Sequence, residues 1–370
     1  MEPMDGAERS GTTLNLAALN GRRSEVTAAL KQLEHALLTD GWCTIVDDRL
    51  VEPTNNLYAA AEPLFKDADI CALHKRDALP GEHLGLTFLG DGEEPLYDEG
   101  AKSQFVRSFN MHEEVDGATC DARLGGNPDY DAEERALAHG FHSWLPSDQT
   151  TKLRSAASDL RKTLHTVACE PLLKAFALLL GLDESYLASR CSMTTSDNTS
   201  LLRCLEYPQE DAAAGGHEDE AVWGVSCHTD FELFSLLHEQ SAGLQLCDPE
   251  GVWHAPSSSS SSSWVLIVGD MLSRLSSGYL HATPHRVIAT RADAAIPRRS
   301  IVFFQALDEN VALAPVKREA ARRAPTGRFR RWWDETGGRA VEDAALTQRE
   351  WTELKEAAAN ERRLKRERDG

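Results

Sequence analysis

The feature that most constrains the fold is a series of short apolar or alternating segments after residue 200, each bounded by turn residues. They read "LLRCLEY", "VWGVSCHTDF", "LFSLLHE", "GLQLCD", "WVLIVGD", "HRVIAT" and "SIVFFQAL". Apolar runs of this length, at this spacing, are typical of many short strands rather than of helices. They predict an all-β sandwich or barrel in the second half of the chain.

The first half predicts helices and loops. Apolar residues recur at helical spacing from Ser24 to Asp40, with Ser24 as the N-cap, and "GWCTIVDD" then predicts a short strand. A second helical stretch runs from about residue 152 to 180, where Pro171 should kink or divide it and Gly181 should end it. Residues 75–150 predict long loops with short strand-like pieces such as "SQFVRSFNM", and the chain beyond about residue 326 predicts helix with a solvated end.

Composition narrows the class of partner. The net charge of −20 disfavours nucleic acid and anionic membranes, which need basic surface, and favours a small-molecule substrate. The eight cysteines are scattered without a CxxC pair, which suits reduced thiols. Because the N-terminus lacks an apolar leader and no run is long enough to span a bilayer, we expect a cytoplasmic protein. We also expect it to be a monomer.

One strand-like stretch carries two metal-competent groups. In "SCHTDF", His228 and Asp230 stand two residues apart, so in a strand they would share a face while Thr229 would point the other way. Such a pair is half of a chelate. About one such spacing is expected by chance in a chain with 13 histidines, and a hydrogen-bonded strand pair is the alternative. His281 and His285 in "GYLHATPHRVIAT" are both candidates for a third ligand.

A second pair predicts an anion site. Arg298 and Ser300 in "RRSIVFF" are also two residues apart and would share a strand face. A guanidinium and a hydroxyl pointing inward together are suited to bind a carboxylate by charge-assisted hydrogen bonds.

Taken in order, these motifs resemble a known family. HxD, then about 55 residues, then HRV, then RxS resembles the iron(II) and 2-oxoglutarate dependent oxygenases of the isopenicillin N synthase-like group. The intervening "HTDFELFSLLHEQSAGLQL", "GVWHAP", "VLIVGDML" and "GYLHATPHRV" are similar to that group in the same order, and "LLRCLEYP" falls where its Arg-x-Asn-x-Tyr-Pro strand should be. The match is looser in "LEHALLTDGWCTIVDD" and "HSWLP", and it covers roughly residues 12–310.

The resemblance implies a two-histidine, one-carboxylate iron site made of His228, Asp230 and His285. His285 is preferred over His281 because it begins the HRV motif of the family. The resemblance also implies that Arg298 and Ser300 bind the distal carboxylate of 2-oxoglutarate, joined by Tyr207, although Tyr207 could instead be a strand tyrosine buried for packing. Phe304 shares their face and could line a substrate pocket, with core packing as the equal alternative.

Several features depart from the pattern or carry no function here. Leu205 stands where the family has asparagine, the hairpin before Arg298 is about three residues longer than usual, and seven serines (257–263) replace a Pro-Gly turn. We expect the serines to form a surface connector away from iron, because they offer no apolar surface to offset the entropy of ordering them. We interpret the basic segment 317–333 as solvated and His217 as an exposed loop histidine.

These inferences predict a mainly β fold with flanking helices and a double-stranded β-helix (jelly roll) core at residues 195–315. An α-rich region (1–194) resembling the non-haem dioxygenase N-terminal domain precedes it, and a helical, charge-rich tail (316–370) follows. The expected activity is hydroxylation, or a related oxidation, of a small organic substrate coupled to decarboxylation of 2-oxoglutarate. Fe(II), 2-oxoglutarate and O2 would be required, with ascorbate as a further candidate. An iron oxidase of the same fold that does not use 2-oxoglutarate, and a non-catalytic binding module, are the alternatives.

Overall fold

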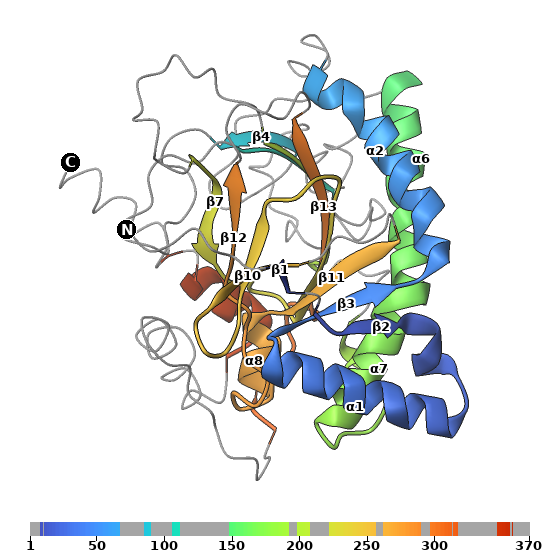
Figure 1. Ribbon diagram of the computed structural model, residues 1–370, viewed down its shortest axis with the longest axis vertical. Helices are drawn as coiled ribbons and strands as arrows, with labels where there is room; N and C mark the ends of the chain where they lie inside the picture. The colour runs from blue at the N-terminus through green and yellow to red at the C-terminus, as the bar shows by residue number, and fades with distance from the viewer. Residues whose placement is uncertain are drawn as a thin grey trace, which may run out of the picture.

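A computed structural model describes residues 8–9, 11–66, 85–89, 106–111, 148–191, 198–207, 222–256, 262–289, 297–312, 314–316, 346–355 and 357. Within these residues two β-sheets face each other, and helices cover the outer side of the larger sheet (Figure 1). The element order is therefore helix and strand first, then a nearly continuous series of strands, as the sequence predicts.

The larger sheet has eight strands in the described residues, and the smaller has five. In spatial order the larger sheet contains β2 (Thr13–Asn15), β3 (Trp42–Val46), β11 (Ser263–Val268), β8 (Phe234–Glu239), β13 (Arg298–Gln305), β6 (Leu201–Tyr207), β5 (Val106–Met111) and β4 (Gly85–Leu89). The smaller sheet contains β1 (Glu8–Arg9), β10 (Trp253–Pro256), β9 (Leu244–Cys247), β12 (His285–Ala289) and β7 (Val222–His228). Each segment after residue 200 that the sequence pattern assigns to a strand forms one.

Alternation along β13 separates an inner face from an outer face. Val302 and Phe304 belong to a cluster between the two sheets, which also contains Leu244 and Leu246 of β9. Ile301 and Phe303 point to the other face and belong to a larger cluster shared with the helices. Because side chains in a strand point to opposite faces in turn, one strand serves both cores, and the phase of the alternation decides which residues face the interior.

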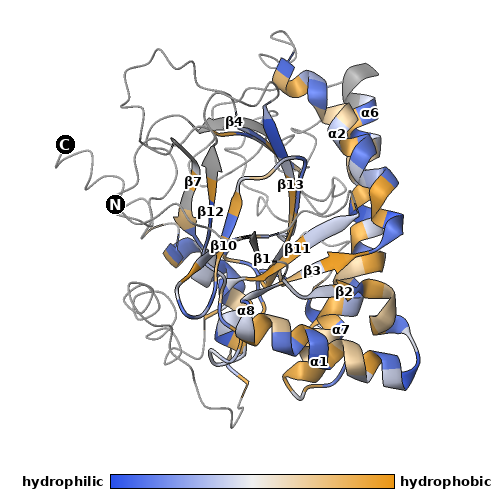
Figure 2. Ribbon diagram, in the orientation of Figure 1, coloured by the Kyte–Doolittle hydropathy of each residue, from blue (hydrophilic) through white to orange (hydrophobic). Residues whose placement is uncertain are grey.

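The helices stabilise the sheet from outside. The described helical elements are η1 (Leu16–Asn20), α1 (Arg23–Thr39), η2 (Asp48–Leu50), α2 (Val51–Lys66), α6 (Asp148–Leu164), η4 (His165–Cys169, a π-helical turn), α7 (Glu170–Leu179), η5 (Ala188–Arg190) and α8 (Asp270–Leu275). Hydrophobic and hydrophilic residues interleave along α2 and α6, as expected of helices with one buried face (Figure 2). Two polar side chains add contacts: Tyr58 of α2 donates its hydroxyl to the carbonyl of His238 at 3.0 Å, and Arg161 of α6 donates to the carbonyl of Met111.

The predicted helix boundaries are partly correct. The first helix begins at Arg23, so the predicted N-cap, Ser24, is wrong; the residue before the helix is Arg22, whose backbone N–H donates to Glu25 at 2.6 Å. Pro171 lies in the first turn of α7, where its missing N–H is tolerated, and the helical backbone passes from α6 to α7 through the π-helical turn two residues before it. Gly181 ends it in a left-handed conformation with φ of +72°.

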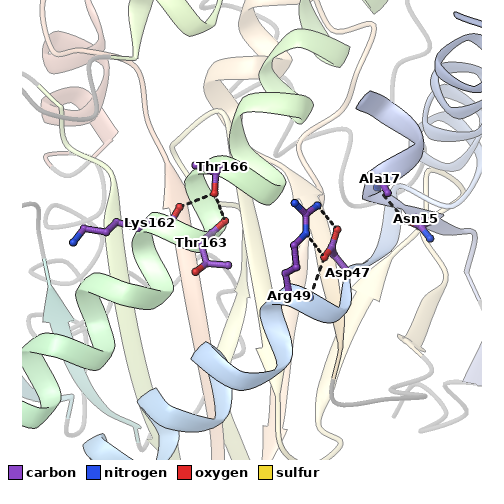
Figure 3. Close-up of polar contacts among 7 residues, drawn as sticks. All are labelled: Asn15, Ala17, Asp47, Arg49, Lys162, Thr163 and Thr166. Atoms are coloured by element: carbon purple, nitrogen blue, oxygen red, sulfur yellow. Dashed lines mark hydrogen bonds and ion pairs between the residues drawn. The ribbon is translucent and has the colours of Figure 1, made fainter. Parts of the chain in front are cut away.

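Short polar contacts set the chain direction on either side of β3 (Figure 3). Asn15 accepts a hydrogen bond from the backbone N–H of Ala17 at 2.9 Å and so begins η1. Asp47 accepts from the backbone N–H of Arg49 at 3.0 Å and pairs with its guanidinium at 2.7 Å, which begins η2. Such local caps satisfy N–H groups that would otherwise lack partners at a helix start.

Part of the C-terminal region packs onto the barrel. Residues 348–355 are helical, and Trp351 is buried under the guanidinium of Arg274 of α8, 5.3 Å from its ring centroid. Lys355 is buried and lies 2.6 Å from Asp270, the first residue of α8. This contact places the C-terminal helix against the element that follows β11.

The structure describes only part of several other segments for which the sequence makes predictions. Ser263 is the first residue of β11 and pairs with Val46, whereas residues 257–261 of the serine run, and the charged segments 317–333 and 361–370, lie outside the described residues. The proposed boundary between residues 194 and 195 stays a prediction, and we note that β2, β3, β4 and β5 complete the larger sheet from the N-terminal side of it. None of the helices in the described ranges combines the length and apolar character needed to cross a membrane.

Candidate metal centre and carboxylate site

Three metal-competent side chains converge at one end of the smaller sheet. One ligand atom from each of His228, Asp230 and His285 lies within 4.8 Å of the other two. β7 ends at His228 and β12 begins at His285, and the antiparallel pairing of these strands places the two histidines directly opposite each other. Their ring centroids are 4.1 Å apart. Among the described residues, no other group of this kind gathers three such side chains.

Additional hydrogen bonds orient the ligand atoms. His285 donates its Nδ1–H to the carbonyl of Thr283 at 3.1 Å, which leaves Nε2 as the atom that can bind a metal. Ser235 donates its hydroxyl to Oδ2 of Asp230. The other oxygen, Oδ1, lies 3.6 Å from Nε2 of His228 and 3.7 Å from Nε2 of His285. Metal–ligand bonds of about 2.1 Å permit ligand separations of this size.

The prediction that Asp230 lies on the same strand as His228 is wrong. Asp230 is not on the strand, because β7 ends at His228 and the chain turns immediately afterwards. The turn is held by Asp270, whose backbone N–H donates to the carbonyl of Asp230 at 2.8 Å and whose Oδ1 accepts from the Thr229 hydroxyl at 3.0 Å. Asp230 therefore reaches the histidines from a turn fixed by the start of α8.

The competing histidines are not part of this cluster. His281 lies four residues before His285, but its ring is not in the group of three. Burial lowers the pKa of His281 to about 4, so this side chain is neutral near pH 7. His217 lies outside the described residues.

The side chains predicted to bind 2-oxoglutarate lie on β13 and its neighbour β6. Arg298 is paired in register with Tyr207, and its guanidinium carbon is 4.5 Å from the centre of the tyrosine ring. Ser300 is buried and is paired with Leu205, the residue that stands in place of the family's asparagine. By alternation these residues face the interior between the sheets, the same space that His285 faces from β12. In Figure 1, β7 and β12 lie on one side of that interior and β13 on the other.

Tyr207 spans the interior and contacts the smaller sheet. A Cβ added to Gly224 of β7 would come within 2.6 Å of the tyrosine ring and 3.0 Å of Val287 on β12. Only a glycine leaves room for the ring at this point. Phe304 also belongs to the inner cluster, and the guanidinium carbon of Arg203 lies 5.1 Å from its ring centroid.

The structure adds a residue that the sequence argument missed. Glu239, the last residue of β8, forms an ion pair with Arg298, and the distance from its Oε2 to Nη2 is 2.6 Å. Burial by itself lowers the pKa of Arg298, but Tyr207 and Glu239 raise it above its ordinary value, so the guanidinium stays charged. Its other two nitrogens, Nε and Nη1, are buried and make no hydrogen bond of normal geometry among the described residues, although the Tyr207 hydroxyl interacts with the guanidinium and helps to raise its pKa. Two buried donors of this kind are what a second carboxylate would satisfy.

Comparisons with known proteins agree with this geometry. Residues 198–306, which contain β6 to β13, match the model of the 2OG-Fe(II) oxygenase superfamily. This part of the chain therefore contains a domain of that superfamily. The predicted family is therefore confirmed, and the superfamily uses Fe(II), 2-oxoglutarate and O2.

Sequence relatives of this oxygenase chain are found in fungi and plants. It is 28% identical over 247 residues to the 2-oxoglutarate-dependent dioxygenase frbA of Dothideomycetidae sp. (strain 11243), covering 62% of this chain and 65% of that protein. It is 28% identical over 223 residues to gibberellin 2-beta-dioxygenase 2 of Oryza sativa subsp. japonica, covering 55% and 59% respectively. The alignments thus span less than two thirds of these relatives.

Solved structures with a bound cosubstrate confirm the predicted jelly-roll fold. A full-length Neurospora crassa protein in complex with alpha-KG superimposes with a TM-score of 0.66 at 17% identity, covering 96% of this chain and 98% of that one. JOX2 in complex with 2OG, Fe and JA gives a TM-score of 0.61 at 17% identity, covering 94% and 92%. At this level of identity the superposition establishes the fold, and the chemistry has to be argued from the site.

Proposed function

We propose that this oxygenase couples the oxidative decarboxylation of 2-oxoglutarate to the hydroxylation, or a related oxidation, of a small organic substrate. The observation that carries the proposal is the convergence of His228, Asp230 and His285, each oriented toward a common point. Two imidazoles and one carboxylate on one face are the donor set that suits non-haem Fe(II) and leaves further positions open.

The residues of this chain would hold and orient the reactants. His228, Asp230 and His285 would bind Fe(II), with Ser235 and the carbonyl of Thr283 keeping their ligand atoms in place. When bound, Fe(II) together with 2-oxoglutarate and O2 supplies the oxidising chemistry. Because the donor atoms already have fixed orientations, little reorganisation is needed when the metal enters.

Arg298, Ser300 and Tyr207 would hold the distal carboxylate of 2-oxoglutarate. The two nitrogens of Arg298 without partners in the described residues support this role, and the ring of Tyr207 restricts where the guanidinium can lie. An apolar inner cluster that includes Leu205, Val287 and Phe304 would exclude water from the reacting centre. Phe304 would contact the substrate, since it shares the face of Arg298 and Ser300.

The wider assignment rests on charge and thiol chemistry. We propose that the enzyme acts on small molecules rather than on nucleic acid, because its net charge is −20. We further propose that it is monomeric and cytoplasmic. None of the six described cysteines is in a disulfide with another of them, and five are buried, which supports a reducing compartment.

Anaerobic reconstitution tests the proposal. Purified protein is mixed with Fe(II) and 2-oxoglutarate without oxygen, and its visible spectrum is followed for the metal-to-ligand charge-transfer band of a chelated 2-oxo acid. We expect the band to appear and, after oxygen is admitted, succinate to form in proportion to 2-oxoglutarate consumed. An iron-loaded protein that shows neither the band nor succinate would contradict the proposal and favour the same-fold oxidase that does not use 2-oxoglutarate.

A further inference from the structure

The guanidinium proposed to bind 2-oxoglutarate already faces a carboxylate of its own chain. Arg298 and Glu239 form a buried ion pair, with only 10% and 8% of their side chains exposed. Nη2 of Arg298 therefore already donates to Glu239, although the same guanidinium would bind the distal carboxylate. Nε and Nη1 are the Arg298 donors without a hydrogen-bond partner in the described residues.

Strand pairing explains why Glu239 is at this place. β8 and β13 are antiparallel neighbours, and Glu239 is directly opposite Ser300, the partner of Arg298 in the RxS motif. The period of two along β8 puts Glu239 on the inner face with Ser235, which contacts Asp230. The same oxygen of Glu239 that pairs with Arg298 also accepts a hydrogen bond at 3.3 Å from the backbone N–H of Leu244, the first residue of β9. The carboxylate is thus held from both sheets.

This arrangement changes the electrostatics of the site. Arg298 and Glu239 together carry no net charge, so an entering dicarboxylate does not meet an isolated cation. Its distal carboxylate would also lie beside a second, buried carboxylate, and like charges repel strongly where water is excluded. A 2-oxo acid without a distal carboxylate would not depend on the charge of Arg298 and would not be repelled by Glu239.

We propose that Glu239 competes with the distal carboxylate of 2-oxoglutarate for Arg298, and so sets the affinity for this cosubstrate and its preference over 2-oxo acids that lack that group. The inference rests on the proposed function, because it assumes that Arg298 is the carboxylate site. Glu239 acts as a positioning and selectivity residue and takes no part in the reaction at the metal.

The test compares a neutral isostere of Glu239 with a matched control. Glu239→Gln keeps the shape of the side chain and can still accept the hydrogen bond of Leu244, but it removes the charge. Glu206→Gln makes the same change in the neighbouring ion pair with Arg299, where Nη2 and Oε2 are 2.8 Å apart on the outer face of the same sheet. Calorimetry on the anaerobic, Fe(II)-loaded full chain measures binding of 2-oxoglutarate and of 2-oxopentanoate, which has the same carbon chain without the distal carboxylate.

We expect Glu239→Gln to lower the Kd of 2-oxoglutarate at least about 10-fold, while that of 2-oxopentanoate and the values for Glu206→Gln stay within about twofold of wild type. An unchanged or higher Kd of 2-oxoglutarate in Glu239→Gln would overturn the proposal, as would equal tightening of both ligands. If Glu239→Gln fails to fold by circular dichroism, Glu239→Ala makes the same test of charge.

Arg298→Ala separates this inference from the proposed function. If Arg298→Ala leaves 2-oxoglutarate binding unchanged, the proposed cosubstrate site itself is wrong. If it weakens binding, and Glu239→Gln still has no effect, the site stands and only the role of Glu239 is refuted.

Discussion

Arg298 and Arg299 are consecutive residues of β13, both form ion pairs with glutamates, and they point to opposite faces of the same sheet. Arg299, on the helix-covered side, has a carboxylate oxygen within 3.9 Å of each of its three side-chain nitrogens, from Glu206 and from Glu62 of α2. Arg298, on the inner side, has a carboxylate on one nitrogen, and its other two have no partner in the described part of the chain.

The difference shows how one sheet separates stability from function. On the outer face carboxylates neutralise Arg299, although its Nη2 makes no hydrogen bond of normal geometry, and its guanidinium carbon lies 5.8 Å from the centre of the Phe65 ring, also on α2. On the inner face two nitrogens of Arg298 lack hydrogen-bond partners among the described residues, and Oδ1 of Asp230 lies 3.6 and 3.7 Å from the two Nε2 atoms, too far for a direct hydrogen bond. Unsatisfied but fixed polar groups are typical of a binding site, because burying them without a ligand is unfavourable.

The largest difference should appear between a histidine of the inner site and one of the outer face. His285→Ala should reduce Fe(II) affinity by more than about 100-fold, since removing even a residue that supports a ligand weakens metal sites by about 10- to 100-fold. His238→Ala should leave iron binding nearly unchanged but destabilise the fold, because His238 lies within 3.0 Å of the Tyr58 hydroxyl on α2. Iron content after dialysis measures the first effect, and urea unfolding measures the second. Equal loss of iron in both variants would break the comparison.

The adjacent phenylalanines of β13 offer the next contrast. Phe303 is fully buried under the helices, and Phe303→Ala should cost about 3 to 5 kcal/mol of unfolding free energy without changing the affinity for iron or 2-oxoglutarate. Phe304, which is 8% exposed on the inner face, should in addition lower kcat/KM for the organic substrate when changed to alanine. Steady-state kinetics on the folded fraction decide the matter. If Phe304→Ala changes stability alone, Phe304 is a core residue and does not contact substrate.

Removing the two arginines one at a time tests the comparison directly. Arg298→Ala should weaken 2-oxoglutarate binding by about 2 to 5 kcal/mol, because it removes the charge partner of a buried carboxylate. Arg299→Ala should instead lower the unfolding free energy by about 3 kcal/mol, since it leaves Glu206 buried without its nearest cation. Calorimetric titration and chemical unfolding, applied to both variants, separate the outcomes. A loss of cosubstrate affinity in Arg299→Ala that matched Arg298→Ala would contradict the division between faces.

The sequence was sufficient to predict much of this site. Spacing by two correctly placed Arg298 and Ser300 on one strand face, and the HRV motif selected His285, which the structure brings beside His228 and Asp230. The placement of these residues agrees with the structure because it depends on residues near one another in the chain or on a family pattern, while their roles stay predictions. Short apolar runs bounded by turn residues likewise predicted the strands after residue 200.

Contacts between distant segments could not be predicted in this way. Glu239 is 59 residues from Arg298, and its role depends on the register of β8 against β13, which a single sequence does not reveal. The same holds for Lys355 beside Asp270, a contact made by a helix after a long charged segment. Asp230 was wrongly placed on a strand because alternation predicts faces but not where a strand ends.

The smallest effect concerns His281, which is partly buried like His228 but lies outside the group of three. Burial lowers its pKa from 6.5 to about 4 in the folded protein, so between these values the unfolded chain binds more protons than the native one. The stability due to neutral His281 is therefore fully present above about pH 6.5 and is lost as the pH falls through about 4, to a maximum of about 3 kcal/mol.

His281→Gln cannot take up this proton. Urea titration from pH 7 to pH 4 measures the unfolding free energy of wild type and of His281→Gln. The value for wild type should fall by about 3 kcal/mol more than the value for His281→Gln. A difference that stays constant over this range would mean that His281 ionises as readily in the folded protein as in the unfolded chain.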